Sequence, residues 1–372
     1  MIAIEARHFG DWWKSIDRTL LFVVFALISV GLILSLASSP AATVRENISD
    51  PFHFLYRHSF FAAISLIVLL FVSSLDHRNI RRLCALTLLG SLALVVVTVL
   101  MGHEVGGASR WLRFAGFSLQ PSEFLKPSLI VIAAWLFAEA RNGAPIPGRL
   151  IAFGLYLASV VLLMMQPDFG QSILITLCFG GIFFVAGLNW RWMLGLATTA
   201  TAGVISAWMF LPYVATRVER FLNPDSGERY QTETAIAAIS RGGLMGVGPG
   251  EGIIKRSLPD SHSDFIFSVA AEEFGLMASL AIIGLFSILV ARAWMNALKL
   301  TDHFAQLAVT GLALQFGLQA VINIGVNLDL IPPKGMTLPF ISYGGSSMLA
   351  LALGAGLMLA LTRRRPGAYL RA

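Results

Sequence analysis

The strongest constraint on this chain is a series of long apolar runs that recurs along it. Each run has about 20 residues, the length that a helix needs to cross a hydrocarbon layer roughly 30 Å thick. Backbone polar groups inside lipid must be satisfied within the segment, so the runs predict helices. They lie at residues 19–39, 59–75, 83–101, 121–138, 149–165, 170–188, 192–211, 268–291, 304–327 and 340–362.

The composition agrees with lipid as the main solvent. Of the 372 residues, 56% are hydrophobic and only 13% are charged, a balance that is not typical of water-soluble domains. We find no linker and no internal repeat that would divide the chain or indicate an inverted-repeat transporter. We therefore predict an all-α integral membrane protein in which residues 1–372 form one bundle of about ten transmembrane helices.

The distribution of Lys and Arg predicts the orientation of the bundle. The side that carries both termini collects 15 of these residues, and the opposite side collects 11, six of them in the long segment 212–267. The cytoplasmic side is the one enriched in Lys and Arg, so we expect residues 1–18 and 363–372 to be cytoplasmic. Segment 212–267, between spans seven and eight, is then a large extracytoplasmic loop, and its apolar stretch 235–239 predicts a short surface helix. The net charge of +6 mostly reflects this bias and does not indicate nucleic-acid binding.

The ninth predicted span carries a polar stripe. Gln315, Gln319, Asn323 and Asn327 recur every four residues, which brings them to one face of a helix. Such a face is unsuited to lipid. The stripe indicates either hydrogen bonds between helices or the lining of a cavity, and the spacing does not separate these two.

Two opposite charges lie at the start of the fourth predicted span. Glu123 and Lys126 are three residues apart and share one helical face, so they can neutralise each other. Ionisable residues at membrane depth are costly and require a partner or a function. The pair is either a structural ion pair or, with Arg110 in the preceding loop, the mouth of a polar cavity.

The densest acidic cluster surrounds the start of the eighth predicted span. Asp264 stands where a polar loop meets the bilayer, a place where desolvation raises the pKa of a carboxyl group toward the range useful for proton abstraction. The simpler interpretation is that Asp264 caps the helix. His262 is a metal ligand, a second base or an ordinary loop residue, and Glu272 and Glu273 complete the cluster.

A glycine-rich run at 242–252 precedes this cluster. It fails the phosphate-loop pattern, because Lys255 has no glycine before it and Glu251 occupies the last glycine position of a dinucleotide-binding match. The run is then either a turn that binds an anion through its backbone amides or a flexible loop.

From the residues alone, the chain is a membrane protein with a charged cavity that opens outward, and both an enzyme and a transporter fit this description.

Six motifs, in order along the chain, closely resemble those of the SEDS proteins (shape, elongation, division and sporulation), and the division branch more than the elongation branch. Ser263 stands where family members often have Thr, which keeps the hydroxyl group. The motifs are Gly107-Ala108-Ser109-Arg110-Trp111-Leu112, Gln120-Pro121-Ser122-Glu123 through Lys126, Gln166-Pro167-Asp168-Phe169-Gly170, Phe221-Leu222-Asn223-Pro224, 258–265 and 334–347.

The resemblance implies a peptidoglycan glycosyltransferase that polymerises lipid II at the outer face of the cytoplasmic membrane. Asp264 would be its general base. Arg110 and Lys126 would balance the charge of the pyrophosphate, with Glu123 orienting Lys126, and a divalent cation such as Mg²⁺ would assist them. The same resemblance implies that His262, Lys334 and Ser342 contact the substrate.

The resemblance also implies partners and a location. The partners would be lipid II, the growing glycan strand, a class B penicillin-binding transpeptidase and other membrane proteins of the divisome, and the location would be the inner membrane at the septum. Three alternatives stand beside this hypothesis: a lipid II flippase, an elongation-type polymerase of the same family, and a scaffold that only recruits the transpeptidase.

Overall fold

The protein is described here by a computed structural model. It describes residues 10–101, 103–105, 108–114, 117–187, 190–210, 215, 219, 230–333 and 335–363, and for some positions within helices and strands it describes the backbone alone. Lys334, the motif at 221–224, most of 211–229 and the extreme ends of the chain lie outside the described residues.

Each of the ten predicted spans overlaps one long helix. The helices are α2 (Arg18–Arg45), α3 (His53–Ser73), α4 (His77–Met101), α5 (Pro121–Arg141), α6 (Gly148–Met165), α7 (Phe169–Val185), α8 (Trp190–Phe210), α11 (Ile266–Ala297), α12 (His303–Asn327) and α13 (Gly345–Leu361). Within the described residues, six of them, α2, α3, α4, α6, α11 and α12, are long and apolar enough to cross a membrane. The mostly helical membrane fold is confirmed, whereas the number of ten spans stays a prediction.

The start of the last helix differs from its predicted position at residue 340. Helix α13 begins only at Gly345. The backbone at Phe340 has a positive φ of 64°, which is incompatible with a right-handed helix. The residues before Gly345 form turns, in which the amides of Ile341 and Ser342 donate to the carbonyl of Leu338. Hydropathy alone does not separate these apolar turns from the helix that follows.

Helix α12 forms the centre of the bundle. It packs against α5, α7, α11 and α13. Of its most apolar stretch, 72% of the residues are buried, compared with 28% for α3, α4, α6 and α11. The polar stripe of α12 is therefore enclosed by protein, while the other four helices leave broad apolar faces for lipid.

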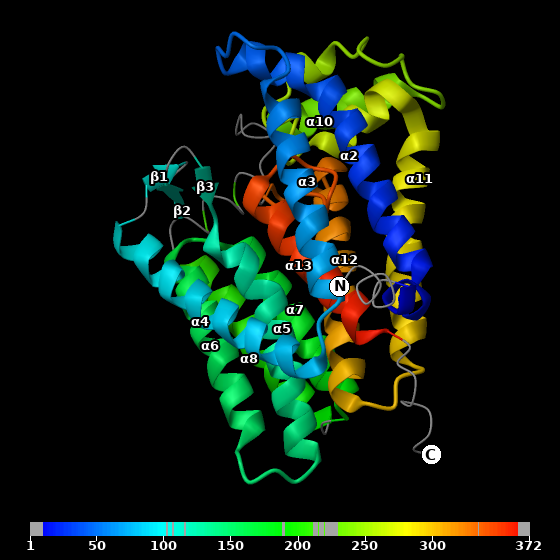
Figure 1. The fold of residues 1–372 in the computed structure, drawn as a ribbon. Coiled ribbons are helices and arrows are strands. Elements are labelled where there is room, and N and C mark those ends of the chain that lie inside the picture. The colour runs from blue at the N-terminus through cyan, green and yellow to red at the C-terminus, as the bar shows by residue number, and fades with distance from the viewer. Residues whose placement is uncertain are drawn as a thin grey trace.

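The described polar elements gather at one end of the bundle (Figure 1). Here lie the surface helix α10 (Tyr230–Gly242), which was predicted, and the short turn η1 (Ile254–Arg256). A three-stranded antiparallel sheet, which was not predicted, joins α4 to α5. Its strands are β1 (His103–Val105), β2 (Ala108–Phe114) and β3 (Phe117–Leu119), and β2 carries Arg110.

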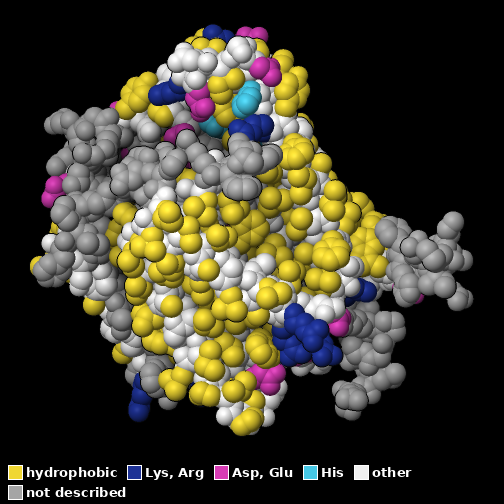
Figure 2. Space-filling model, turned by 60° about the vertical axis from the view of Figure 1, so that its left-hand side comes forward, with side chains coloured by type: hydrophobic (Ala, Val, Ile, Leu, Met, Phe, Trp, Pro, Cys, Tyr) yellow, Lys and Arg dark blue, Asp and Glu magenta, His cyan; other side chains and the backbone are white. Residues whose placement is uncertain are grey.

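The surface of one face supports a membrane setting. Hydrophobic side chains cover its middle, and charged side chains collect toward its two ends, with the visible His side chains at the upper end (Figure 2). Many of the exposed apolar side chains belong to α3 and α4, for example Ile67 and Leu86, which are 67% and 71% exposed. A band of exposed apolar side chains like this one suits contact with the hydrocarbon of a membrane and would be unusual on a monomer in water.

Candidate active site

Asp264 lies in the loop between η1 and α11, and its main chain is held by the polar stripe of α12. Its carbonyl oxygen accepts hydrogen bonds from the side-chain amides of Asn323, at 2.9 Å, and Asn327, at 3.0 Å. The interpretation of Asp264 as the helix cap is wrong. Helix α11 begins at Ile266, its N-cap is Phe265, and no side chain caps it. The carboxylate is thus not used up in capping the helix.

The surroundings of this carboxylate favour proton transfer near neutral pH. The pKa of Asp264 is raised to about 7, mainly by burial and in part by the charge of Asp260, while the charge of Arg110 acts in the opposite direction. The backbone of Gly335, which has a positive φ of 64°, lies next to this side chain. A Cβ atom added at Gly335 would be 3.7 Å from Asp264 Oδ2. A carboxyl group with such a pKa is deprotonated often enough to act as a base and still binds a proton strongly.

A second segment fixes the same loop from the opposite side. Ser342 donates from its hydroxyl to the carbonyl of Ser263 at 2.6 Å and accepts from the amide of Leu338 at 2.7 Å. The amide of Tyr343 donates to the carbonyl of His262 at 3.0 Å. Ser342, predicted to contact substrate, is buried at this position, so its observed role is to position the loop that carries Asp264.

His262 lies in an aromatic cluster beside the loop. Its ring stacks on Phe54 at 4.2 Å and lies 5.4 Å from the ring of Tyr343. Burial lowers the pKa of His262 to about 4, so the ring is neutral at pH 7. Its Nδ1 is buried without a hydrogen-bond partner among the described residues.

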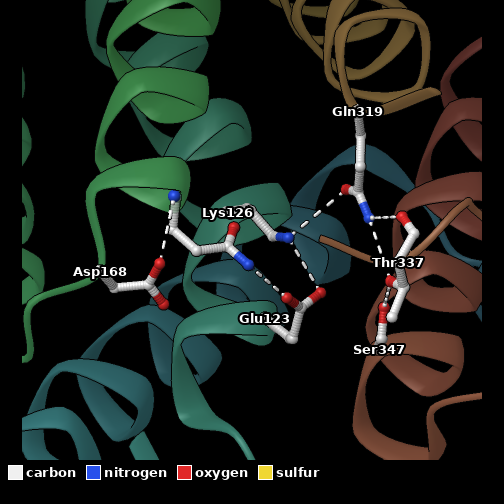
Figure 3. A network of polar contacts seen from close by, with 7 residues as sticks. Glu123, Lys126, Asp168, Gln319, Thr337 and Ser347 are labelled. Atoms are coloured by element: carbon white, nitrogen blue, oxygen red, sulfur yellow. Dashed lines mark hydrogen bonds and ion pairs between the residues drawn. The ribbon is translucent and has the colours of Figure 1, made fainter. Parts of the chain in front are cut away.

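Glu123 and Lys126 form the centre of a buried polar network (Figure 3). Lys126 Nζ donates to Glu123 Oε2 at 2.9 Å and to Gln319 Oε1 at 3.4 Å, and Gln171 Nε2 donates to Glu123 Oε1 at 2.7 Å. The two charged side chains are 1% and 4% exposed. In this state they form an internal ion pair and do not line an open cavity.

The polar stripe of α12 connects this network to the Asp264 loop. Successive stripe residues are four positions apart, about 6 Å along a helix axis. Gln319 contacts Lys126 and donates to the carbonyl of Thr337 at 3.0 Å, and one turn later Asn323 holds the carbonyl of Asp264. Hydrogen bonding between segments therefore explains the stripe. At Gln315 alone, Oε1 is buried with no partner in the described part of the chain.

Arg110 reaches the network through Asp168. Its guanidinium lies 3.8 Å from Asp168 Oδ2 and donates to the carbonyls of Gln166, at 3.3 Å, and Pro167, at 2.5 Å. Asp168 caps α7 by accepting from the amide of Gln171 at 3.4 Å. Burial raises the pKa of Asp168, and the charge of Arg110 partly offsets this.

Asp168 and Gln171 were not among the predicted site residues. The signal for Asp168 was present, because it stands in the motif at 166–170 directly before an apolar run. Gln171 could not be found from the sequence, because its contact with Glu123 joins α7 to α5, 48 residues apart.

The carboxylates of Glu272 and Glu273, predicted to belong to the acidic cluster, have structural roles. Glu272 accepts from the amides of Ile253, Ile254 and Lys255 at 2.9 to 3.0 Å. Glu273 forms an ion pair with Lys255. These two acids therefore anchor η1 to α11, and Asp264 stands apart from them.

The glycine-rich run also packs against α11. Gly275 interrupts that helix with φ 75° and ψ −170°, and amides of the run satisfy carbonyls that the interruption leaves free, Val247 N to Glu272 O and Gly248 N to Glu273 O, both at 3.0 Å. In return, Leu276 N donates to Gly243 O at 2.9 Å. The run is thus an ordered brace for a kink, and the expectation of a flexible loop is wrong.

Among the described residues, no group of three or more His, Cys, Asp or Glu side chains is arranged to hold a metal ion. Nearby carboxylates are already engaged, Glu123 by Lys126 and Asp168 by Arg110. The described part of this site therefore does not form a metal cage.

The fold and the site together define a polytopic membrane protein with a half-buried carboxylate at one end of a helix bundle and a buried ion-pair network that α12 connects to the carboxylate's loop. A family model described as a cell cycle protein, that of FtsW, RodA and SpoVE, matches residues 18–366. The chain belongs to this family.

Several relatives cover nearly the whole chain. A protein of Caulobacter vibrioides named probable peptidoglycan glycosyltransferase FtsW is 52% identical over 360 residues, which are 97% of this chain and 92% of the relative. A protein of Hydrogenovibrio crunogenus with the same name is 36% identical over 369 residues, 95% of this chain and 92% of the relative.

Solved structures agree with the sequence relatives. A chain from a peptidoglycan synthase complex in which polymerization and crosslinking are coordinated superposes with a TM-score of 0.76 at 30% identity, covering 93% of this chain and 97% of that chain. The rod shape determining protein RodA of Thermus thermophilus superposes with a TM-score of 0.68 at 29% identity, covering 94% and 97%.

Proposed function

We propose that the chain is a peptidoglycan glycosyltransferase that polymerises lipid II during septal cell-wall synthesis, with Asp264 as general base. The observation that carries the proposal is the position of this residue: a half-buried carboxylate, with its pKa raised to about 7, on a loop whose main chain α12 holds in place. The relatives named FtsW support the reaction class and the division role.

The reaction requires one base and no covalent intermediate. Asp264 takes the proton from the C4 hydroxyl of the acceptor sugar while the hydroxyl oxygen attacks the anomeric carbon of the donor. The bond from that carbon to undecaprenyl pyrophosphate breaks, and the pyrophosphate leaves with the electron pair. An α-linked donor yields a β-1,4 bond by this single displacement. A positioned base contributes about 100- to 10,000-fold to the rate.

The cations of the network supply electrostatic stabilisation. Arg110 lies close enough to lower the pKa of Asp264, so its field also reaches the leaving pyrophosphate beside that carboxylate. Lys126 is buried and held by Glu123, and it acts on the developing charge from within the protein. His262, which is neutral, offers a ring nitrogen to the substrate, and Lys334 completes the proposed contact set, while Ser342 holds the loop that carries Asp264.

A divalent cation such as Mg²⁺ enters the proposal only as an ion carried by the pyrophosphate. Mg²⁺ commonly binds through substrate phosphates and one or two carboxylates. Because the described residues form no metal cage, no step of the reaction is derived through it.

The proposed setting follows from the bundle and from the relatives. Both termini lie in the cytoplasm and the Asp264 end faces outward, as the bias of Lys and Arg indicates. The partner is a class B penicillin-binding transpeptidase within the divisome, and the similar chain from a synthase complex that couples polymerization to crosslinking supports this.

Purified protein supplied with lipid II tests the proposed activity. We expect glycan strands to form in detergent, where no membrane separates two compartments. A flippase would give no strands in detergent but would move labelled lipid II across vesicles, and a scaffold would do neither while still binding the transpeptidase. Either of these two results would sink the proposal.

A further inference from the structure

A cavity lies beside the end of α2 that faces the η1 loop. Its volume is about 730 Å³, and its lining does not include Asp264. One wall is apolar and comes from Leu36, Pro40 and Val44 of α2. Leu36 and Val44 are 50% and 78% exposed on a helix apolar enough to span a membrane, so this wall is continuous with the surface that lipid would cover.

The rim of this cavity is cationic. Arg45, Lys255 and Arg256 line it, and none of the lining residues is acidic. The guanidinium of Arg45 donates to the carbonyl of Ser257 at 2.8 Å, which fixes it at the rim. Lys255 is neutralised by Glu273, so the charge available to a ligand comes mainly from Arg45 and Arg256.

A ligand that suits these walls carries phosphate at one end and a hydrocarbon chain at the other. Guanidinium groups bind phosphate oxygens in pairs, and two of them match two phosphates. The apolar wall comes from a single helix, which favours one hydrocarbon chain over the two chains of a phospholipid.

We propose that this cavity binds the diphosphate of a polyprenyl-linked lipid, with Arg45 and Arg256 on the phosphates and the isoprenoid chain along Leu36, Pro40 and Val44. The proposal rests on the proposed function and adds a binding site to it. The loop that forms the cavity rim at 255–257 continues to Asp264. A lipid held here is therefore one loop away from the base, in a position to be loaded or released.

Binding of undecaprenyl pyrophosphate to the full-length protein in nanodiscs tests the site directly. We expect Arg256→Glu to raise the Kd for this probe at least tenfold and the KM for lipid II with it, with kcat little changed. Arg256→Lys should retain most of the binding. Arg78→Gln serves as the control, because Arg78 is an exposed cation on α4 that does not line the cavity.

Two results would overturn the proposal: Arg256→Glu binding the probe as the unmodified protein does, or phosphatidylglycerol displacing the probe at equal concentration, which would make this a general site for anionic lipid. The melting temperature of each variant shows whether it has folded. Asp264→Asn should bind the probe normally. Failure of the unmodified protein to make strands would contradict the proposed function, while the binding data judge the cavity separately.

Discussion

At the scale of single residues, the proposed activity depends on the environment of Asp264. The carboxylate must be deprotonated to accept a proton, and burial holds its pKa at about 7. Polymerisation should therefore rise with pH through about 7 and fall roughly tenfold per pH unit below it. A pH profile of kcat/KM for lipid II measures this loss of activity at low pH, the acid limb of the profile.

Two neighbouring charges should move that limb in opposite directions. Asp260 raises the pKa of Asp264 and Arg110 lowers it. We expect Asp260→Asn to shift the acid limb to lower pH, and Arg110→Gln to shift it to higher pH in addition to lowering the rate. If the acid limb shifted by the same amount and in the same direction in both variants, it would report the titration of a group other than Asp264.

The ion pair of Glu123 and Lys126 calls for a double-mutant cycle. Either Glu123→Gln or Lys126→Met leaves one buried charge without its partner, which should cost about 3 to 5 kcal/mol. The double variant should recover much of this stability, because neither charge then remains. Thermal unfolding measures the coupling. If Lys126 also acts on the pyrophosphate, the double variant should stay inactive after its stability returns.

At the scale of elements, α12 holds the loop that carries Asp264. Asn327 accepts from the amide and hydroxyl of Ser268, at 3.1 and 2.7 Å, and donates to the carbonyl of Asp264. We expect Asn327→Leu to lower kcat about 100-fold by displacing Asp264, with a smaller effect on lipid II binding.

Gln315 offers a matched control for this prediction. It lies three turns earlier on the same face of α12, and its Oε1 has no partner in the described part of the chain. Gln315→Leu should leave kcat within a few-fold of the unmodified value. If both substitutions lowered kcat equally, the stripe would act through general packing and not through the Asp264 loop.

The kink of α11 is a second element-scale feature with a sharp test. Gly275 adopts a backbone conformation open essentially to glycine alone, and an added Cβ would overlap Leu244 O and Gly246 N. Gly275→Ala should lower stability and activity together, as the brace from the glycine-rich run is lost. Gly284→Ala, on the same helix with nothing within 4 Å of the new Cβ, should be neutral or slightly stabilising in the same melting assay.

At the scale of the whole molecule, hydropathy predicted the helices well because each apolar run is long and strongly marked. The sheet at 103–119 was missed, since strands of three to seven residues leave little periodic signal. The shortened α13 was missed because Phe340 and Ile341, in the turns before it, extend the apolar run that the helix continues.

The site was predictable only where one segment contains the signal. Glu123 and Lys126 share a helical turn, so their pairing followed from spacing. The hydrogen bonds from Asn323 and Ser342 to the Asp264 loop join residues that are 59 and 79 positions apart in the sequence. No pattern within one segment of the sequence predicts them. Likewise, Lys255 of η1 and Glu273 of α11 pair across 18 positions, and no pattern within one segment predicts that contact.

The central claim is that Asp264 is the base of a lipid II polymerase. The most direct test compares glycan-strand formation by the unmodified protein and by Asp264→Asn, which keeps the shape of the side chain and removes its ability to take a proton. We expect the variant to fold, to bind lipid II and to make no strands above background. Strands formed by Asp264→Asn at the unmodified rate would contradict the role of Asp264 as the base.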